Sequence, residues 1–256
     1  MSLGADGPMD AGAVTSTSAG TRECEFTYMG RVAYQEGWDL QRRLGELRMR
    51  DEISDTLLLL EHPHTFTLGR TANPANILLD KDRLSELGIE TYAIDRGGDV
   101  TYHGPGQLVG YPIMLVEDRR DLLRYIRNLE EVIMRALAEY GIQSGRIEGL
   151  SGVWVGEEKI AAIGVKMGRV TSHGFALNVT TDLTCFGYLI PCGIRDKGVT
   201  SMLGQLQLVG SPTDGLTLER LVEPITHHFG EVFGRRMVET SCIAAGRYQP
   251  AAAVTL

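Results

Sequence analysis

The run Leu57–Leu60 limits what this chain can fold into more than any other stretch. Four consecutive leucines form a continuous apolar run of strand length, which indicates a strand buried on both faces. The clearest helix covers residues 118–140, where apolar side chains recur every three or four residues until Gly141. Strands are also predicted at 24–28, at 90–94 and across 145–179, and helices at 32–50, 81–87 and 216–233. Strands and helices are therefore mixed along the whole chain.

The size and charge of the chain exclude several classes of protein. Its 256 residues fit one domain, and we expect a disordered tail at 1–22, a folded domain at 23–240 and a C-terminal tail at 241–256. A net charge of −8 argues against nucleic-acid binding, which normally requires a basic surface. No apolar run approaches the ~20 residues of a membrane span. The N-terminus has no basic and apolar signal-peptide pattern, so the cytoplasm is the expected compartment.

Cysteine and lysine provide the first candidate chemistry. The four scattered cysteines, Cys24, Cys185, Cys192 and Cys242, form no CxxC pair and are expected to be reduced thiols. Cys192 stands in a tight Pro-Cys-Gly turn, where a thiol is open to attack an acyl carbon. Lys159 lies on a predicted strand, and a nearby ammonium lowers a thiol pKa from ~8.5 and populates the nucleophilic thiolate. The pair suggests acyl transfer through a cysteine thioester.

A glycine-rich stretch, residues 95–116, is the second candidate region. Gly97-Gly98 and Gly104-Pro105-Gly106 favour turns, and the alternating residues between them predict a hairpin that projects Arg96 and His103 toward a pocket. The spacing of GPGQLVG does not match the dinucleotide fingerprint, and no GxxxxGK[ST] loop occurs in the sequence. Neither a nucleotide nor another cofactor is expected.

Two further patterns allow either an ordinary structural interpretation or a functional one. His62 and His64 stand two residues apart, as half a zinc site would, but they lack further ligands nearby and Pro63 indicates a turn, so no metal is expected. The arginines within 42–50 favour a solvated helix face, and the alternative is a docking patch for an acidic carrier protein. Arg120, Arg124 and Arg127 form a second basic cluster.

Three motifs then occur in one order: RGGDVTYHGPGQLVGYP at 96–112, KIAAIG with SHGFALNV within 159–179, and PCGI at 191–194. Together they closely resemble the octanoyltransferases of lipoate biosynthesis, the lipoyl(octanoyl) transferases. The resemblance runs from about Leu57 to Thr200, and LEHP at 60–63 also fits it. Residues 1–23 and 240–256 show no such match.

The resemblance implies a fold and a reaction. The fold is α+β and two-layered, a mixed and largely antiparallel sheet flanked by helices, as in the catalytic domains of lipoate and biotin protein ligases. The reaction moves octanoyl from octanoyl-acyl carrier protein onto the cysteine. The group then passes to a lysine of a lipoyl domain, in 2-oxoacid dehydrogenase complexes or the glycine cleavage H protein.

The resemblance also implies roles for particular residues. Cys192 is the implied nucleophile, and Lys159 is the implied lysine that lowers its pKa. Implied to bind the acyl chain are Arg96, Gly97, Gly98, Asp99, Val100, Thr101, Tyr102, His103, Ala162, Ile163, Gly164, Gly174, Phe175 and Ala176. His103 and His173 are expected to orient the site by hydrogen bonds rather than to transfer protons.

Lys166 competes with Lys159, because both lie on one predicted strand. If that strand is regular, Lys159, Ala161, Ile163 and Val165 share one face and Lys166 points to the other. At most one of the two lysines then faces Cys192. The family pattern selects Lys159.

Three other functions remain open at this stage. An ATP-dependent lipoate or biotin ligase would share the fold and the lysine, but would give Cys192 no purpose. A Cys-His hydrolase would use Cys192 with His173 or His103 and release free acid. A binding module without catalysis would treat Cys192 as an inert buried residue. Both expected partner proteins are acidic, so the net charge of −8 leads us to expect docking at one of the two arginine clusters.

Overall fold

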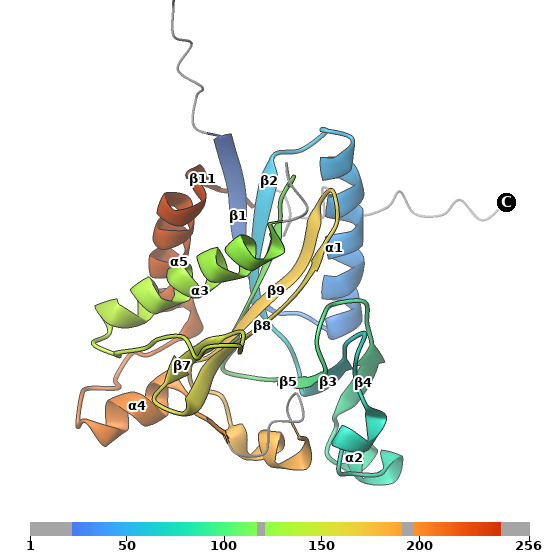
Figure 1. The fold of residues 1–256 in the computed structure, drawn as a ribbon, viewed down its shortest axis with the longest axis vertical. Helices are drawn as coiled ribbons and strands as arrows, with labels where there is room; N and C mark the ends of the chain where they lie inside the picture. The colour runs from blue at the N-terminus through green and yellow to red at the C-terminus, as the bar shows by residue number, and fades with distance from the viewer. Residues whose placement is uncertain (1–21, 117–120, 191–196, 242–256) are drawn as a thin grey trace, which may run out of the picture.

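A mixed sheet forms the centre of the molecule in the computed structural model, which describes residues 22–116, 121–190 and 197–241 (Figure 1). Its strand order is β10-β8-β9-β6-β2-β1-β11, with β7 paired to β8. The strands are β1 (Arg22–Arg31), β2 (Asp55–Glu61), β6 (Gln107–Ile113), β7 (Val153–Val155), β8 (Glu158–Met167), β9 (Thr171–Asn178), β10 (Gly198–Val199) and β11 (Arg235–Glu239). Neighbours from β7 through β2 pair antiparallel, whereas β10, β1 and β11 add parallel pairings. The expected α+β fold is confirmed.

The leucine run occupies β2 in the middle of this sheet and is buried on both faces, as predicted. Leu57 and Leu59 pack with α3 (Leu122–Glu139) and α5 (Leu218–Phe233). Leu58 and Leu60 pack on the other face with α1 (Tyr34–Met49). Figure 1 shows α3 and α5 together on one side of the sheet and α1 on the other. Alternation along one strand thus supplies two separate apolar cores.

A second, three-stranded sheet has the order β4-β3-β5, with β3 (Thr65–Leu68), β4 (Glu90–Ala93) and β5 (Val100–His103). The predicted hairpin at 95–116 is therefore wrong, because β5 pairs with β3 whereas β6 pairs with β2 and β9. Gly104-Pro105-Gly106 carries the chain from one sheet to the other. Gly106 has a φ of +80° and its carbonyl accepts the backbone N–H groups of Val179 and Thr180, so the turn is fixed to the end of β9.

The remaining elements are short. They are α2 (Lys81–Glu86), α4 (Met202–Leu208), and the 3₁₀ turns η1 (Pro74–Asn76) and η2 (Leu183–Tyr188). The predicted helices at 32–50, 81–87 and 216–233 are confirmed within two residues at each end. The described part of the helix predicted at 118–140 is α3. Among the described residues, no helix is both long and apolar enough to cross a bilayer.

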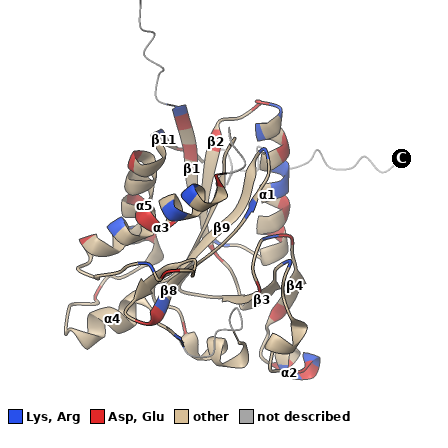
Figure 2. Ribbon diagram, in the orientation of Figure 1, with Lys and Arg blue, Asp and Glu red and all other residues tan. Residues whose placement is uncertain are grey.

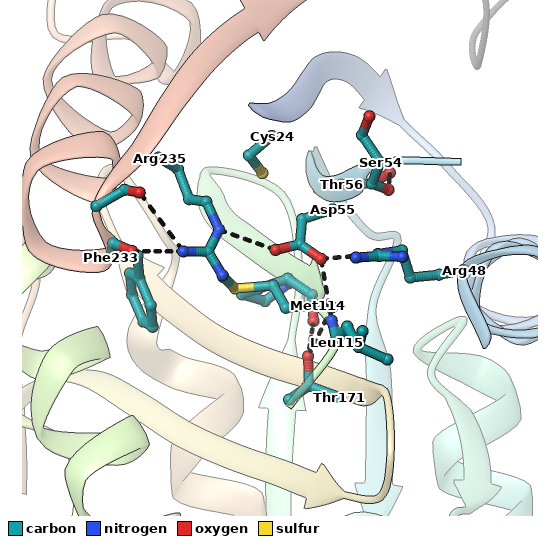
Figure 3. A network of polar contacts seen from close by, with 12 residues as sticks. Cys24, Arg48, Ser54, Asp55, Thr56, Met114, Leu115, Thr171, Phe233 and Arg235 are labelled. Atoms are coloured by element: carbon teal, nitrogen blue, oxygen red, sulfur yellow. Dashed lines mark hydrogen bonds and ion pairs between the residues drawn. The ribbon is translucent and has the colours of Figure 1, made fainter. Parts of the chain in front are cut away.

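A buried ion network holds the edge of the main sheet to α1 (Figure 3). The Asp55 carboxylate accepts hydrogen bonds from Arg48 Nε at 2.8 Å, from Arg235 Nε at 2.9 Å and from the N–H of Leu115 at 3.0 Å. Asp55 and Arg48 are both buried, so the prediction that Arg48 lies on a solvated face is wrong. The thiol of Cys24, paired with Asp55 in the strand register, has a pKa raised by burial.

The other described arginines of the two basic clusters are mostly matched by acids. Arg42 pairs with Asp39, and Arg124 with Asp121. Arg127 pairs with the fully buried Glu130 of its own helix. Figure 2 shows basic and acidic residues interspersed along α1 and α3 rather than a uniform basic face. Arg120 lies outside the described residues.

Candidate active site

A cavity of about 240 Å³ lies between strands β8 and β9 of the main sheet and the Arg96–His103 segment. Strands β8 and β9 supply one wall, and the segment that enters β5 supplies the opposite wall. Its predicted lining residues are Lys159, Arg96, Gly97, Gly98, Val100, Thr101, His103, Ala162, Ile163, Gly164, His173, Gly174, Phe175 and Ala176. The structure therefore brings the first two sequence motifs to one place.

Two predicted binding residues do not line this cavity. The carboxylate of Asp99 accepts hydrogen bonds from the N–H of Asn73 at 3.0 Å and from the side chain of Asn76 at 2.5 Å. Tyr102 is fully buried, and its hydroxyl shares a 2.8 Å hydrogen bond with Nδ1 of His64. Both side chains hold the loop and the second sheet in shape, because their polar atoms are engaged with protein groups.

Small residues on β8 and β9 make room for the cavity. Gly164 faces Gly174, and Ala162 faces Ala176 across the antiparallel pair. A Cβ on Gly174 would meet the carbonyl oxygen of Gly110, and one on Gly164 would meet Cδ of Arg96. Larger side chains here would fill the space or push the strands apart, so the sequence keeps this surface flat.

Lys159 reaches the cavity through an irregularity in β8. The pairing of β7 with β8 shifts between Val153 and Trp154, so Ala161 and Lys159 are successive partners. The side chains of β8 alternate between the two faces from Ala161 onward, but this alternation does not extend back to Lys159. The premise of a regular strand is therefore wrong. Lys159 lines the cavity together with Ala162 and Gly164, which the regular pattern would place on the opposite face. Its Nζ lies 4.7 Å from the centre of the Trp154 ring, within cation–π range.

Lys166, the competing lysine, stands at the other end of the same strand. Its Nζ donates to Oδ2 of Asp95 at 2.5 Å, its side chain is half-exposed, and it is not among the cavity-lining residues. Lys159 therefore lines the cavity and Lys166 does not, although the argument from alternating side chains on a regular strand fails.

Cys192 and the PCGI motif lie outside the described residues. The described chain on either side reaches the cavity, because Phe186 of η2 and Val199 of β10 both line it. Val199 pairs with Lys159 in a parallel register, and the N–H of Thr200 donates to the carbonyl of Lys159 at 3.0 Å. The two described cysteines, Cys24 and Cys185, are buried free thiols.

Arg96 brings a buried cation to the cavity wall. Its guanidinium donates to the carbonyl and the hydroxyl of Thr67, each at 2.9 Å, and to the carbonyl of Gly97 at 2.9 Å. These bonds hold the loop that carries Gly97 and Gly98 against β3. The position of Arg96 was predicted, but its bonds to backbone oxygens indicate a structural anchor.

His103 is a neutral imidazole, because burial lowers its pKa to about 3. Its Nδ1 lies 2.8 Å from Oε1 of Gln107. Nε2 of Gln107 donates to the carbonyl of Tyr102, and since a carbonyl only accepts, this bond fixes which way the amide points. Nδ1 of His103 must therefore carry the proton, and Nε2 keeps its lone pair. The bond to Gln107 thus fixes both the orientation and the tautomer of His103.

His173 is held in a rare backbone conformation at the far end of the cavity. Its φ is +57°, which costs a non-glycine residue about 1–3 kcal/mol, and its N–H donates to Oε1 of Gln41 on α1. Burial lowers its pKa, and Nε2 donates to Oδ1 of Asp95 at 2.8 Å. Burial opposes ionisation of Asp95, but the bonds and charges of His173 and Lys166 outweigh it and lower its pKa to about 2.

Sequence reasoning missed several lining residues: Tyr34, Gln107, Tyr111, Leu122, Ile126, Ser151, Val165, Asn178, Phe186 and Val199. Gln107 and Tyr111 stand inside the first motif and Asn178 inside the second, so the motifs held a signal for these three. Leu122 and Ile126 belong to the apolar stripe of α3 and look like ordinary core residues. Only the fold shows that these two lie at the cavity.

The paired histidines near β2 do not share a metal site. Nδ1 of His62 donates to the carbonyl of Val32 at 2.7 Å, and its Nε2 accepts from the hydroxyl of Tyr111 at 2.7 Å. His64 instead bonds Tyr102. Among the described residues, His227, His228 and Glu231 form a group with metal-ligand spacing on α5, and none of them lines the cavity.

Comparison with known proteins gives both a matching family and named relatives. Residues 33–230 match the family model described as the lipoyl protein ligase A/B catalytic domain. The octanoyltransferase of Solibacter usitatus is 48% identical over 226 residues, which cover 88% of this chain and 99% of that protein. The octanoyltransferase of Chloroflexus aurantiacus is 49% identical over 211 residues, with 80% and 92% covered.

Solved structures share the fold at much lower identity. A lipoate-protein ligase A bound with ATP aligns with a TM-score of 0.67 at 17% identity, covering 89% of this chain and 95% of that one. A bipartite lipoate protein ligase of Thermoplasma acidophilum aligns with a TM-score of 0.60 at 18% identity, covering 90% and 93%. The chain belongs to the lipoyl protein ligase A/B catalytic domain family and, by its relatives, to the octanoyltransferases, which are acyltransferases.

Proposed function

We propose that this protein transfers an octanoyl group from octanoyl-acyl carrier protein to a lysine of a lipoyl domain through a thioester on Cys192. Lipoyl domains of 2-oxoacid dehydrogenase complexes and the glycine cleavage H protein are the proposed acceptors. The reaction needs no cofactor, because a thioester replaces a thioester in the first step and an amide forms downhill in the second. A reducing compartment such as the cytoplasm suits it, since the thiol must stay reduced.

The observation that carries the proposal is the position of Lys159. It lines the same apolar cavity as Ala162 and Gly164, and it pairs with Val199, which leads back along the chain to the PCGI motif. On the other side of that motif, the N–H of Ile190 donates to the carbonyl of Asn76, whose side chain bonds Asp99. Cys192 is two residues from Ile190, a reach of about 7 Å at most. Both flanks therefore support a meeting of Cys192 with the cavity.

The proposed first step is acyl transfer to the enzyme. The Lys159 ammonium favours the Cys192 thiolate, which attacks the thioester carbonyl of the donor. A carbon–sulfur bond to Cys192 forms, the bond to the carrier sulfur breaks, and the carrier thiolate takes a proton from the Lys159 ammonium, which becomes neutral. The octanoyl chain lies along the floor made by Ala162, Gly164 and their partners on β9.

In the proposed second step the lysine amine of the acceptor attacks the Cys192 thioester. A carbon–nitrogen bond forms, the carbon–sulfur bond breaks, and Cys192 leaves as thiolate. The attacking amine loses one proton, for which neutral Lys159 is the proposed acceptor. The ammonium form that results is the one needed for the next cycle.

Intact mass spectrometry tests the proposal. After incubation with octanoyl-acyl carrier protein, the parent protein is expected to gain one octanoyl group, and Cys192→Ser is expected to gain none. Transfer to a lipoyl domain without any adduct on the parent would refute the thioester route. Release of free octanoate without transfer would support a Cys-His hydrolase, and formation of an octanoyl adenylate from ATP would support a ligase.

A further inference from the structure

Gln107 and Asn178 form a pair of buried amides next to His103. They face each other as register partners at the start of β6 and the end of β9. Both line the cavity, with 1% and 4% of their surfaces exposed. Burying two amides is costly unless their polar atoms are bonded, so each polar atom is expected to have a partner.

The hydrogen bonds of the pair run in one direction. Nδ1 of His103 donates to Oε1 of Gln107 at 2.8 Å, and Nε2 of Gln107 donates to Oδ1 of Asn178 at 2.9 Å. Nδ2 of Asn178 then donates to the carbonyl of Thr200 at 3.0 Å. The carbonyl of Thr200 can only accept, as can that of Tyr102 at the other end, so neither amide can turn over without losing a bond.

The path ends at the strand position of Lys159. Thr200 directly follows β10, and its N–H donates to the carbonyl of Lys159 at 3.0 Å. The backbone of one residue, Thr200, thus bonds Asn178 through its carbonyl and the backbone of Lys159 through its N–H. A continuous set of hydrogen bonds joins the imidazole of His103 to the place where β10 meets β8.

We propose that Gln107 and Asn178 are positioning residues. Gln107 holds His103 as the tautomer with a proton on Nδ1 and a lone pair on Nε2, and Asn178, bonded to Gln107, fixes β10 beside Lys159. The inference rests on the proposed function for its activity readout but not for its structural one. His103 is packed between the rings of Tyr34, 5.9 Å away, and His62, 5.8 Å away, which limit its tilt but do not choose its tautomer.

The tautomer can be read directly by nitrogen-15 NMR of protein labelled at its six histidines. In the parent protein His103 is expected to show a protonated Nδ1, the minor tautomer of free histidine. Gln107→Met keeps the length of the side chain but removes both amide groups. In this variant the Nδ1-protonated form is expected to lose its dominance. An unchanged tautomer in folded Gln107→Met would overturn the assignment.

Gln107→Glu is the conservative variant. Its carboxylate still accepts from Nδ1 of His103, so the protonated Nδ1 is expected to persist. The added negative charge is expected to shift the titration of His103 to higher pH than in the parent. A titration of His103 that stays where it is in the parent would contradict direct contact. This readout holds even where Gln107→Met does not fold.

Asn178→Ala separates the two halves of the proposal. Gln107 keeps its bond to Tyr102, so the tautomer of His103 is expected to remain, while the bond to Thr200 is lost. We expect octanoyl transfer to fall by roughly 10- to 100-fold, the range typical when groups that orient a site are removed. The loss is expected in kcat rather than in KM. Full activity of folded Asn178→Ala would overturn the coupling to β10.

A matched control is Thr226→Val on α5. Thr226 is equally buried and polar, and its hydroxyl bonds only the carbonyls of Val222 and Glu223 of its own helix. It is expected to keep both the tautomer and the transfer rate. A loss of transfer in Thr226→Val as large as in Asn178→Ala would reduce the effect to general destabilisation. Absence of transfer in the parent protein would instead refute the proposed function and leave the NMR result standing.

Discussion

Nε2 of His173 lies 2.8 Å from Oδ1 of Asp95, and this bond joins β9 of the main sheet to the end of β4 in the smaller sheet. The other carboxylate oxygen of Asp95 bonds Lys166 on β8. A single half-exposed carboxylate thus connects the two sheets at the far end of the cavity from Lys159. The charge on Asp95 therefore determines how strongly the two sheets are linked at this end.

Asp95→Asn is expected to lower the free energy of unfolding near neutral pH by about 1 kcal/mol, after allowance for solvent screening. The pKa of Asp95 is lowered to about 2, below its unfolded value of ~3.9, so its contribution is present above pH ~4 and disappears toward pH 2. Denaturant unfolding at several pH values measures this. The difference between parent and variant should shrink as the pH falls, and a difference that stays constant in acid would contradict this role of Asp95.

Two buried histidines are expected to make the fold sensitive to acid. Burial lowers the pKa of His62 to about 4 and that of His103 to about 3. Because the unfolded chain binds these protons near pH ~6.5, each histidine removes up to about 1.4 kcal/mol of stability per pH unit as the pH falls below that value. Urea unfolding between about pH 7 and about pH 5 tests this. His62→Gln should flatten the slope, and a slope unchanged from the parent would contradict the idea. His227→Gln, exposed on α5, serves as the control.

Asp55→Asn is expected to destabilise the protein by about 3–5 kcal/mol, because Arg48 and Arg235 lose their shared buried carboxylate and Arg48 keeps only the exposed Asp51. Thermal unfolding followed by circular dichroism measures the loss. Arg50→Gln, which removes the exposed pair with Glu52, is the matched control and is expected to change little. Equal and small effects of both substitutions would mean that the network in Figure 3 contributes no more than a surface pair.

Under the proposed mechanism, Lys159→Met is expected to slow formation of the acyl-enzyme by about 100-fold or more, because the proposed Cys192 thiolate would lose its cation and the acceptor amine its base. Lys166→Met removes an identical group from the same strand at a position outside the cavity, and is expected to keep the rate. Quenched-flow mass spectrometry of the adduct compares the two. A larger loss in the Lys166 variant would reverse the assignment.

Arg124→Glu is expected to slow transfer from the acyl carrier protein about 10-fold at low salt, because Arg124 is exposed on α3 between two residues that line the cavity. A small octanoyl thioester should react at the parental rate. Arg83→Glu on α2 removes a comparable exposed arginine with an acidic partner three residues away, and provides the control. Equal slowing with both donors would exclude a docking role.

The positions of the helices and strands could be predicted from local sequence patterns, but the pairing of the strands could not. The Leu57–Leu60 run predicted a strand buried on both faces, because a strand in that position needs apolar side chains at every residue. The pairing of β5 with β3 depends on contacts across more than 30 residues of sequence, and turn chemistry at Gly104-Pro105-Gly106 says only that the chain bends. The hairpin prediction failed for that reason.

The sequence predicted which residues gather at the cavity better than it predicted how they are arranged there. The motifs placed Lys159, His103 and the small residues of β8 and β9 together, and the cavity contains them. The irregular pairing next to Lys159 could not be read from alternation, because it depends on the partner strand β7. Likewise Arg48 looked like a surface charge, since its partner Asp55 comes from another element.

The facing glycines of the cavity floor have unequal freedom to change. At Gly174 an added methyl group would meet main chain, the carbonyl of Gly110, which cannot move without breaking up the sheet. At Gly164 it would meet Cδ of Arg96, a side chain that can move only if its guanidinium gives up its bonds to Thr67 and Gly97. Enlarging a residue of the cavity floor is therefore less disruptive on β8 than on β9, but on β8 it loosens the loop that Arg96 anchors.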